Sequence, residues 1–303
     1  MMELTQLQKR IGEEIPDLEI RCWEPMSKHT SFRIGGPVEV MAFPKSPDEL
    51  KKILQLSAVL DIKPAILGAG TNVLAPDAGM NGIVICLKDS LDRMERLTDD
   101  CILVGAGVTM ARAAVFAATN NLSGLEFAHG IPGTVGGGIY MNAGAYGGDI
   151  SMVCQSVQAM TCDGEIVEYS NSDMRFSYRH SRLEEEDAIV LSAVFRLTPK
   201  PEAQIREVMQ DLMNRRKTSQ PLDKPSAGSA FKRPATGYAA ALIDQTGLKG
   251  YRVGDAAVSE KHAGFVVSLG AATAKDVKQV LADVAEKVYA ATGIQLEPEV
   301  RIW

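Results

Sequence analysis

The chain has 303 residues, of which 46% are hydrophobic and 23% charged, with a formal net charge of −6 at pH 7. This length allows about two domains with a sizeable core, and the negative charge argues against nucleic-acid binding, which needs a positive field. No apolar run approaches the roughly 20 residues of a membrane helix and the N-terminus does not resemble a signal peptide, so we expect a cytoplasmic protein with no nucleic-acid or membrane partner and no evident obligate protein partner.

Near the N-terminus, apolar residues recur at helical spacing and predict a short amphipathic helix. They are Leu4, Leu7, Ile11 and Ile15. Two short strands are then expected, over residues 31–34 and 38–43, with a glycine turn between them. The clearest helix of the first half spans residues 46–59. Ser46 is its expected N-cap, because a glutamate follows three residues later and proline occupies the first helical position.

Two short glycine turns follow predicted buried strands. PAILGAGTN ends in the turn at residues 68–72, and ILVGAGVTM leads into an alanine-rich helix over residues 109–120. Each turn contains GxG without the third glycine of a dinucleotide fingerprint, and no GxxxxGK[ST] motif exists. Rossmann and P-loop folds are therefore poorly supported, although glycine turns can still bind anions through backbone N–H groups.

The most unusual stretch spans residues 124–151 and reads GLEFAHGIPGTVGGGIYMNAGAYGGDIS. Eight of the chain's 27 glycines lie between Gly130 and Gly148. Such density is unfavourable in an ordinary helix or strand and suits positive φ angles or close approach to a ligand. The composition leaves two interpretations open, a cradle for a phosphate-bearing cofactor and a run of tight turns.

The second half of the chain begins with strand patterns over residues 152–197, which predict antiparallel pairing. Residues 198–204, with two prolines, form the expected linker between a domain of residues 1–198 and a domain of residues 199–303. Three further helices are predicted, after residue 204, over 236–245 and over 274–292, the last capped by Thr273 and ended by Gly293. The final ten residues alternate as a strand, with Ile294, Leu296, Val300 and Ile302 on one side.

Several residues could support chemistry, but each also has an ordinary explanation. Glu297 and Glu299 share the other face of the last predicted strand, as a carboxylate pair or a solvated edge. Ser229 in PSAGSAF is either a turn serine or a proton donor beside a basic loop, and Arg179 either a surface ion-pair partner or an anion clamp. The four histidines lack metal spacing and the five cysteines lack a CxxC pair, so no metal site or disulfide is expected.

Six motifs together resemble one known family. HTSFRIGGP, ILGAGTNVL, the 124–151 stretch, SYRHS, PSAGSAFKRP and GIQLEPEVR occur in the order found in UDP-N-acetylenolpyruvoylglucosamine reductases, the flavoproteins of peptidoglycan precursor synthesis. The matches extend from about His29 to Arg301. PSAGS resembles the shorter subtype, which lacks a substrate-capping tyrosine loop.

The resemblance implies an α+β chain whose FAD-binding fold is of the vanillyl-alcohol-oxidase type. Two α/β subdomains would form this FAD-binding part, followed by a C-terminal α+β substrate domain whose last strand returns Glu299 to the flavin. It implies non-covalently bound FAD, NADPH as co-substrate, hydride addition to C3 of the enolpyruvyl group of UDP-N-acetylglucosamine enolpyruvate, and protonation at C2. The product would be UDP-N-acetylmuramate.

The resemblance also implies roles for individual residues. Ser229 is the implied proton donor, and Arg179 and Glu299 polarise the substrate carboxylate, with Glu297 as the alternative if the strand register differs. The expected FAD contacts are Gly68, Ala69, Gly70, Thr71, Asn72, Gly133, Thr134, Gly136, Gly137, Ala143, Gly144 and Tyr146. The expected substrate contacts are Tyr178, Arg216, Gln220, Lys232 and Arg233.

Four positions depart from the family pattern, namely His129, Asp255, Gly264 and Ser268. They put contacts near residues 255–268 in doubt and leave two alternatives to the reductase open. One is a flavin-dependent oxidase on the same scaffold, and the other is a sensor of nucleotide-sugar precursors without catalysis.

Overall fold

Helix-capping side chains set the start of the predicted helices in the computed structural model, which describes residues 5–303. The hydroxyls of Ser46, Thr109 and Thr273 each accept a hydrogen bond from the backbone N–H three residues later. The predicted helices are confirmed, with Leu4 outside the described residues. The helices are α1 (Gln6–Glu14), α2 (Pro47–Val59), α3 (Met110–Thr119), α4 (Val135–Tyr140), α5 (Leu183–Glu186), α6 (Glu202–Ser219), α7 (Ala239–Gln245) and α8 (Ala274–Thr292).

Two compact units are built from alternating segments of the chain. The first comprises the described residues up to Trp23 together with Glu39–Ala69 and Asn81–Asn214, and the second comprises Glu24–Val38, Gly70–Met80 and Arg215–Trp303. The boundary between the units falls inside helix α6: its residues up to Asn214 belong to the first unit and those from Arg215 belong to the second. Each unit therefore depends on residues that are far apart along the chain.

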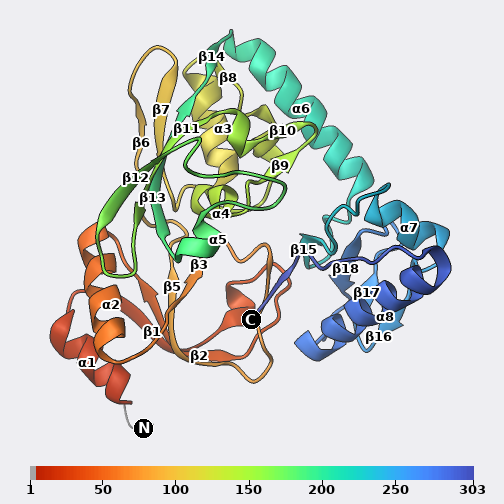
Figure 1. Cartoon of the computed structure of the whole chain (residues 1–303), viewed down its shortest axis with the longest axis horizontal. Helices are drawn as coiled ribbons and strands as arrows, with labels where there is room; N and C mark the ends of the chain where they lie inside the picture. The colour runs from red at the N-terminus through yellow and green to blue at the C-terminus, as the bar shows by residue number, and fades with distance from the viewer. Residues whose placement is uncertain (1–4) are drawn as a thin grey trace. The chain divides into compact units, whose positions relative to one another are not determined.

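The first unit is organised on two sheets (Figure 1). A four-stranded sheet has the order β1-β2-β5-β3, with β3 and β5 parallel, and a five-stranded antiparallel sheet has the order β12-β11-β13-β7-β6. Their strands are β1 (Glu19–Pro25), β2 (Pro37–Phe43), β3 (Ala65–Leu67), β5 (Met80–Cys86), β6 (Met94–Arg96), β7 (Cys101–Gly105), β11 (Cys154–Met160), β12 (Ile166–Ser170) and β13 (Ile189–Arg196).

Two apolar clusters hold the first unit together. Helices α1 and α2 place Ile11, Leu50 and Ile53, all essentially buried, against the four-stranded sheet. Helices α3 and α4 cover the five-stranded sheet through Met110 and Ile139. The shorter elements of this unit are 3₁₀ turns at Glu126–Gly130 and Ile150–Met152, and the strands β8 (Leu122–Ser123), β9 (Gly144–Ala145), β10 (Gly148–Asp149) and β14 (Thr198–Pro199).

The second unit has an antiparallel sheet of order β15-β18-β17-β16, covered by α8 (Figure 1). The predicted apolar face of α8 is buried, and Phe32, Ile34 and Leu74 from the early segments complete the same core. The strands are β4 (Val73–Leu74), β15 (Ser226–Ser229), β16 (Arg252–Val253), β17 (Ala256–Val258), β18 (Phe265–Ser268) and β19 (Arg301–Ile302), and a 3₁₀ turn spans Met26–Lys28.

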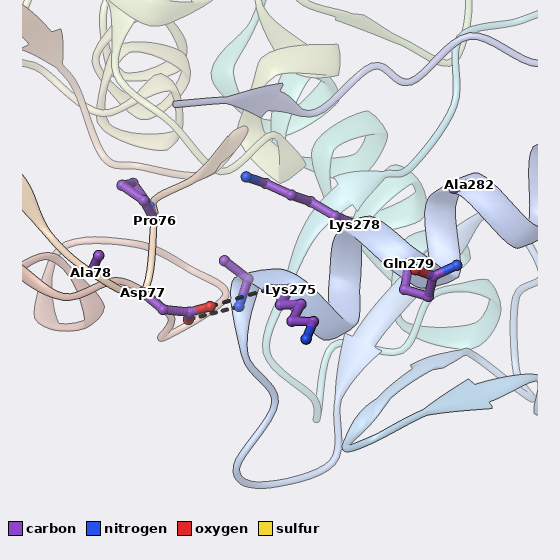
Figure 2. Close-up of a pocket in the computed structure, with 8 residues that line it drawn as sticks. Pro76, Asp77, Ala78, Lys275, Lys278, Gln279 and Ala282 are labelled. Carbon is purple, nitrogen blue, oxygen red and sulfur yellow. Dashed lines mark hydrogen bonds between the residues drawn. The ribbon is translucent and has the colours of Figure 1, made fainter.

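Asp77 attaches an early segment of the second unit to α8. Figure 2 shows its carboxylate facing the first turn of the helix, where the backbone N–H groups of Ala274 and Lys275 donate to it at 2.8 and 3.1 Å. These N–H groups have no partner within the helix, so an acidic side chain there is favourable. The open groove beside this contact contains none of the predicted site residues.

Three local expectations were wrong. Residues 31–34 form a turn rather than a strand, with the Arg33 amide bonded to the Thr30 carbonyl. Only Arg301–Ile302 of the last ten residues is a strand, because Pro298 interrupts the pattern, and Ile302 is exposed although it was expected with the buried residues. The expected linker at 198–204 is instead structured, as β14 pairs with β8 and α6 begins at Glu202.

Candidate active site

The glycine-rich stretch forms a short helix at its centre, contrary to the expectation that no helix would accept it. Gly136, Gly137 and Gly138 lie in α4, which Thr134 caps by accepting a hydrogen bond from the Gly137 amide at 3.3 Å. A Cβ on Gly138 would lie 2.8 Å from the Met110 sulfur. Close helix packing therefore compensates for the low helix propensity of glycine here.

Neighbouring glycines of α4 should respond differently to alanine. Gly138→Ala should lower the free energy of unfolding by about 1–3 kcal/mol, because buried Met110 must move to admit the methyl group. Gly137→Ala should be neutral or slightly stabilising, since only Thr134 Oγ1, at 3.6 Å, would be near the new Cβ. Urea unfolding of the two apoproteins measures the difference, and equal losses would contradict this packing argument.

The first predicted glycine turn meets the glycine-rich stretch within the first unit. A Cβ on Gly68 would lie 2.5 Å from Thr134 Oγ1. The two turns can therefore touch only because residue 68 has no side chain. Gly133 has a φ of +141°, which favours glycine. Ala69 ends the first-unit part of the turn, and Gly70, Thr71 and Asn72 belong to the second unit.

The second predicted glycine turn has a different use. Cβ atoms at Gly105 and Gly107 would collide with the backbone carbonyls of Leu91 and Ser90. These glycines allow one loop to pack closely against another. The weak dinucleotide interpretation of this segment is therefore unnecessary.

Arg179 lies in a tight turn of the first unit at a φ of +56°. Its guanidinium donates to the Gly144 carbonyl at 3.3 Å and lies over the ring of exposed Tyr178. Tyr146, another predicted site residue, also has a positive φ, +55°, and is exposed. Positive φ at residues other than glycine is uncommon and concentrates at functional sites. The structure thus brings Arg179 and Gly144 together.

Two buried polar residues that the sequence analysis did not select hold this turn. Asn142 donates to the Ser177 carbonyl at 3.0 Å and accepts from the Ser151 amide at 3.0 Å. The Ser181 hydroxyl donates to the Tyr140 carbonyl at 2.8 Å. They connect the end of α4 with the Arg179 turn. Both lie inside quoted motifs, Asn142 in the 124–151 stretch and Ser181 at the end of SYRHS, and their small polar side chains were the signal that could have indicated them.

Ser229 lies at a β-bulge in the second unit. Ser226 pairs with Val267 and Ser229 with Phe265, so β15 has one more residue than β18 between these pairs. Gly228, at a φ of +75°, accommodates the irregularity, and Ser229 is exposed. Bulges occur beside active sites because they redirect a side chain.

Glu299 is bound next to Ser229 along the backbone. Its amide donates to the Ala230 carbonyl at 2.9 Å, and its own carbonyl accepts from Asn72 Nδ2 at 3.1 Å. Glu299 is half-buried. The second unit therefore brings Ser229 and Glu299 together, while Arg179 belongs to the first unit.

The two glutamates of the C-terminal segment differ in environment. Glu297 is exposed and forms an ion pair with Lys232, whose amide also donates to the Glu297 carbonyl at 2.8 Å. The Arg233 guanidinium lies over the Tyr238 ring at 4.4 Å. At the end of α6, Gln220 has a buried side-chain oxygen without a hydrogen-bond partner among the described residues, one turn after Arg216.

His262 supports the backbone behind Ser229. Its Nδ1 accepts from the Gly264 amide at 3.1 Å, and the Gly264 carbonyl accepts from Ala230 N–H at 2.8 Å. Its ring meets Phe265 edge-on. Burial lowers the pKa of His262 below its ordinary value. The neutral ring is thus the form that fits this turn.

Acidification should therefore lower the free energy of unfolding. Below about pH 6.5 the unfolded His262 gains a proton that the folded side chain, with its lowered pKa, resists, so stability falls as the pH falls. His262→Asn keeps an acceptor for the Gly264 amide. Between about pH 7 and 5, this variant should take up as many as one proton fewer per molecule on unfolding than wild type does, so its free energy of unfolding should depend less steeply on pH. Urea unfolding at several pH values measures the slope, part of which should persist because burial also lowers the pKa of His129. An unchanged slope would contradict the assignment.

Two further departures from the family pattern, Asp255 and Ser268, have local partners. Asp255 accepts from the Ala271 amide at 2.9 Å and from Arg252. The backbone N–H of Ser268 donates to the Pro225 carbonyl at 2.9 Å. These contacts stabilise the sheet that carries Ser229. Within residues 5–303, no cluster of side chains suited to a metal ion is found, and no helix is both long and apolar enough to span a membrane.

Comparisons with known proteins show which family the chain resembles. Residues 220–303 match the family described as UDP-N-acetylenolpyruvoylglucosamine reductase, C-terminal domain, and residues 38–170 match an FAD binding domain. The chain is 45% identical to the UDP-N-acetylenolpyruvoylglucosamine reductase of Agathobacter rectalis, over 97% of each chain. It is 42% identical to that of Syntrophomonas wolfei, over 96% of this chain and 97% of the relative.

A solved structure of the same kind is also similar. The UDP-N-acetylenolpyruvylglucosamine reductase of Thermus caldophilus aligns with a TM-score of 0.81 and 33% identity, over 94% of this chain and 98% of that one. The expected α+β fold with its FAD-binding part is confirmed. The chain belongs to the UDP-N-acetylenolpyruvoylglucosamine reductase family.

Proposed function

We propose that the protein reduces UDP-N-acetylglucosamine enolpyruvate to UDP-N-acetylmuramate, using NADPH and non-covalently bound FAD, in the synthesis of peptidoglycan precursors. The observation that carries the proposal is that the backbone of half-buried Glu299 binds the carbonyl of Ala230, the residue directly after exposed Ser229 on its bulge, in a chain of this family. We place the reaction in the cytoplasm and invoke small-molecule partners only. In this proposal residues 1–198 bind FAD and residues 199–303 bind the substrate.

The residues present fit a phosphate-bearing cofactor. Gly68 and Thr134 make a contact that a side chain at position 68 would block, and Gly137 leaves space beside the α4 N-cap. We propose that the cradle includes the other predicted FAD contacts, which are Ala69, Gly70, Thr71, Asn72, Gly133, Gly136, Ala143, Gly144 and Tyr146. Bound FAD supplies the hydride-transfer chemistry between NADPH and the enolpyruvyl group.

The chain's own side chains stabilise the charge that develops on the substrate and supply the proton. Hydride addition at C3 places negative charge on C2 and on the adjacent carboxylate of the substrate. Arg179 stabilises that charge, and Glu299 contributes a proton-sharing carboxyl beside it. The Ser229 hydroxyl donates its proton to C2, which completes the lactyl ether. Glu299 is favoured over Glu297 because Glu297 is exposed and paired with Lys232.

Cationic and amide side chains are proposed to bind the nucleotide part of the substrate. Arg216, Lys232 and Arg233 suit a diphosphate. Gln220 offers a buried acceptor that lacks a protein partner among the described residues, as expected of a group awaiting a ligand. Exposed Tyr178, in contact with Arg179, is the proposed aromatic contact.

One assay tests the proposal. The purified protein should be yellow with bound flavin and should oxidise NADPH rapidly only when UDP-N-acetylglucosamine enolpyruvate is added, with formation of the lactyl ether verified by mass spectrometry. Oxygen consumption independent of that substrate would instead support a flavin-dependent oxidase. Bound flavin and substrate without turnover would support a nucleotide-sugar sensor, and absence of flavin would contradict both flavoenzyme functions.

A further inference from the structure

We propose that Asn72 is a positioning residue for Glu299, in addition to its expected place in the cofactor turn. This inference rests on the proposed function, because it assigns Asn72 a part in holding a catalytic carboxyl. The side-chain amide of Asn72 donates to the Glu299 carbonyl at 3.1 Å. The Arg301 amide donates to the Asn72 carbonyl at 2.9 Å. Asn72 thus binds the C-terminal segment on both sides of Val300.

Both backbone groups of Glu299 are engaged by this arrangement. Its carbonyl accepts from Asn72, and its N–H donates to the carbonyl of Ala230, the residue after Ser229. Pro298 before it is held by a β-bridge to Phe231. The backbone from which the Glu299 side chain extends is therefore fixed relative to the strand of the proposed proton donor.

The segment that carries Asn72 is itself anchored. Val73 and Leu74 form β4, which pairs in parallel with β19, and the Trp303 amide donates to the Leu74 carbonyl at 3.1 Å. Leu74 is fully buried in the second-unit core. Asp77 attaches the far end of the segment to α8. Asn72 is consequently held by a rigid support, which a positioning residue requires.

Loss of the amide should impair the reaction with substrate specifically. In Asn72→Ala we expect the Glu299 carbonyl to lose its donor and the carboxyl to shift, so that reoxidation of the reduced flavin by the enolpyruvyl substrate slows roughly 10- to 100-fold. In the FAD-saturated enzyme, the KM for that substrate and the rate of flavin reduction by NADPH should each stay within about three-fold of wild type, because the backbone of the turn remains.

A double-mutant cycle provides the test that a general structural defect would not reproduce. If Asn72 acts through Glu299, Asn72→Ala should slow reoxidation in the wild-type background but add little in a Glu299→Gln background. Additive losses would overturn the proposal, as would weaker FAD binding with reoxidation at wild-type speed in the fully loaded enzyme. Asn120→Ala is the matched control, since its side-chain amide likewise donates to a backbone carbonyl, that of Phe116 at 2.8 Å, in the first unit, and it should leave reoxidation unchanged.

Hydrogen exchange separates this proposal from the function on which it rests. Exchange of the backbone amides of Glu299 and Arg301 should be faster in Asn72→Ala than in wild type, a result that requires no substrate. Unchanged exchange would overturn the positioning role. Faster exchange in a protein whose wild type shows no substrate turnover would uphold the backbone contact while the proposed function fails. Asn72→Asp, which keeps the side-chain shape but replaces the donor by an acceptor, serves if the alanine variant does not fold.

Discussion

Replacing Ser229 by alanine should nearly abolish reduction of the enolpyruvyl substrate while NADPH still reduces the bound flavin at close to the wild-type rate. The hydroxyl is the proposed source of the C2 proton, and general acid catalysis by a positioned group contributes about 10²- to 10⁴-fold. The methyl group leaves the bulge intact, because Ser229 pairs with Phe265 through the backbone. Stopped-flow measurement of the two half-reactions separates the effects.

Two further variants sharpen that experiment. Ser229→Cys retains a group that can donate a proton and should recover part of the lost rate. Thr246→Ala removes another hydroxyl from the second unit, one that donates to the carbonyl of Leu242 at the end of α7, and should leave both half-reactions unchanged. Reoxidation of Ser229→Ala by substrate at the wild-type rate would show that the proton comes from elsewhere.

Glu299→Gln should be the second most damaging substitution, lowering the rate of substrate reduction by about 10²- to 10³-fold with little change in flavin reduction. Glutamine preserves the size of the side chain and leaves the backbone bonds to Ala230 and Asn72 intact. The loss should therefore reflect the missing carboxyl and appear mainly in kcat, since the carboxyl acts on charge that develops during the reaction.

Glu297→Gln is the natural comparison, because it makes the same chemical change two residues earlier. The Glu297 carboxylate is exposed and paired with Lys232, so we expect the substitution to have at most a few-fold effect, seen mainly in the KM for the substrate. Steady-state kinetics at several pH values measures both variants. A larger loss of kcat in Glu297→Gln than in Glu299→Gln would reverse the assignment of the two glutamates.

Local sequence signals predicted much of the fold because they act over a few residues. The predicted caps at Ser46 and Thr273 and the left-handed Gly293 mark helix ends that depend on neighbouring backbone groups alone. The apolar face of α8 was equally clear, because helical spacing determines which residues share a face. The antiparallel pairing of the strands after residue 152 was also predicted correctly.

Features that depend on distant residues were not predictable in this way. Helix α4 tolerates three consecutive glycines because Ala106 and Met110 pack against it, and no property of VGGGIY alone reveals those neighbours. Nothing in PSAGS indicates the bulge, which depends on pairing with β18. The bond from Asn72 to Glu299 joins positions 227 residues apart. The candidate site was therefore found through motifs, and its geometry through the structure.

The alternation of segments between the two units also constrains how the protein can be made. Asp77 and Asn72 are synthesised well before the backbone groups that they bind, which lie 197 residues later in α8 and 227 residues later at Glu299. The second unit cannot complete its core until Val300 has left the ribosome, because Leu74 and Val300 belong to the same apolar core. We therefore expect nascent chains and C-terminal truncations to expose the 24–38 and 70–80 segments, which makes them candidate chaperone-binding sites.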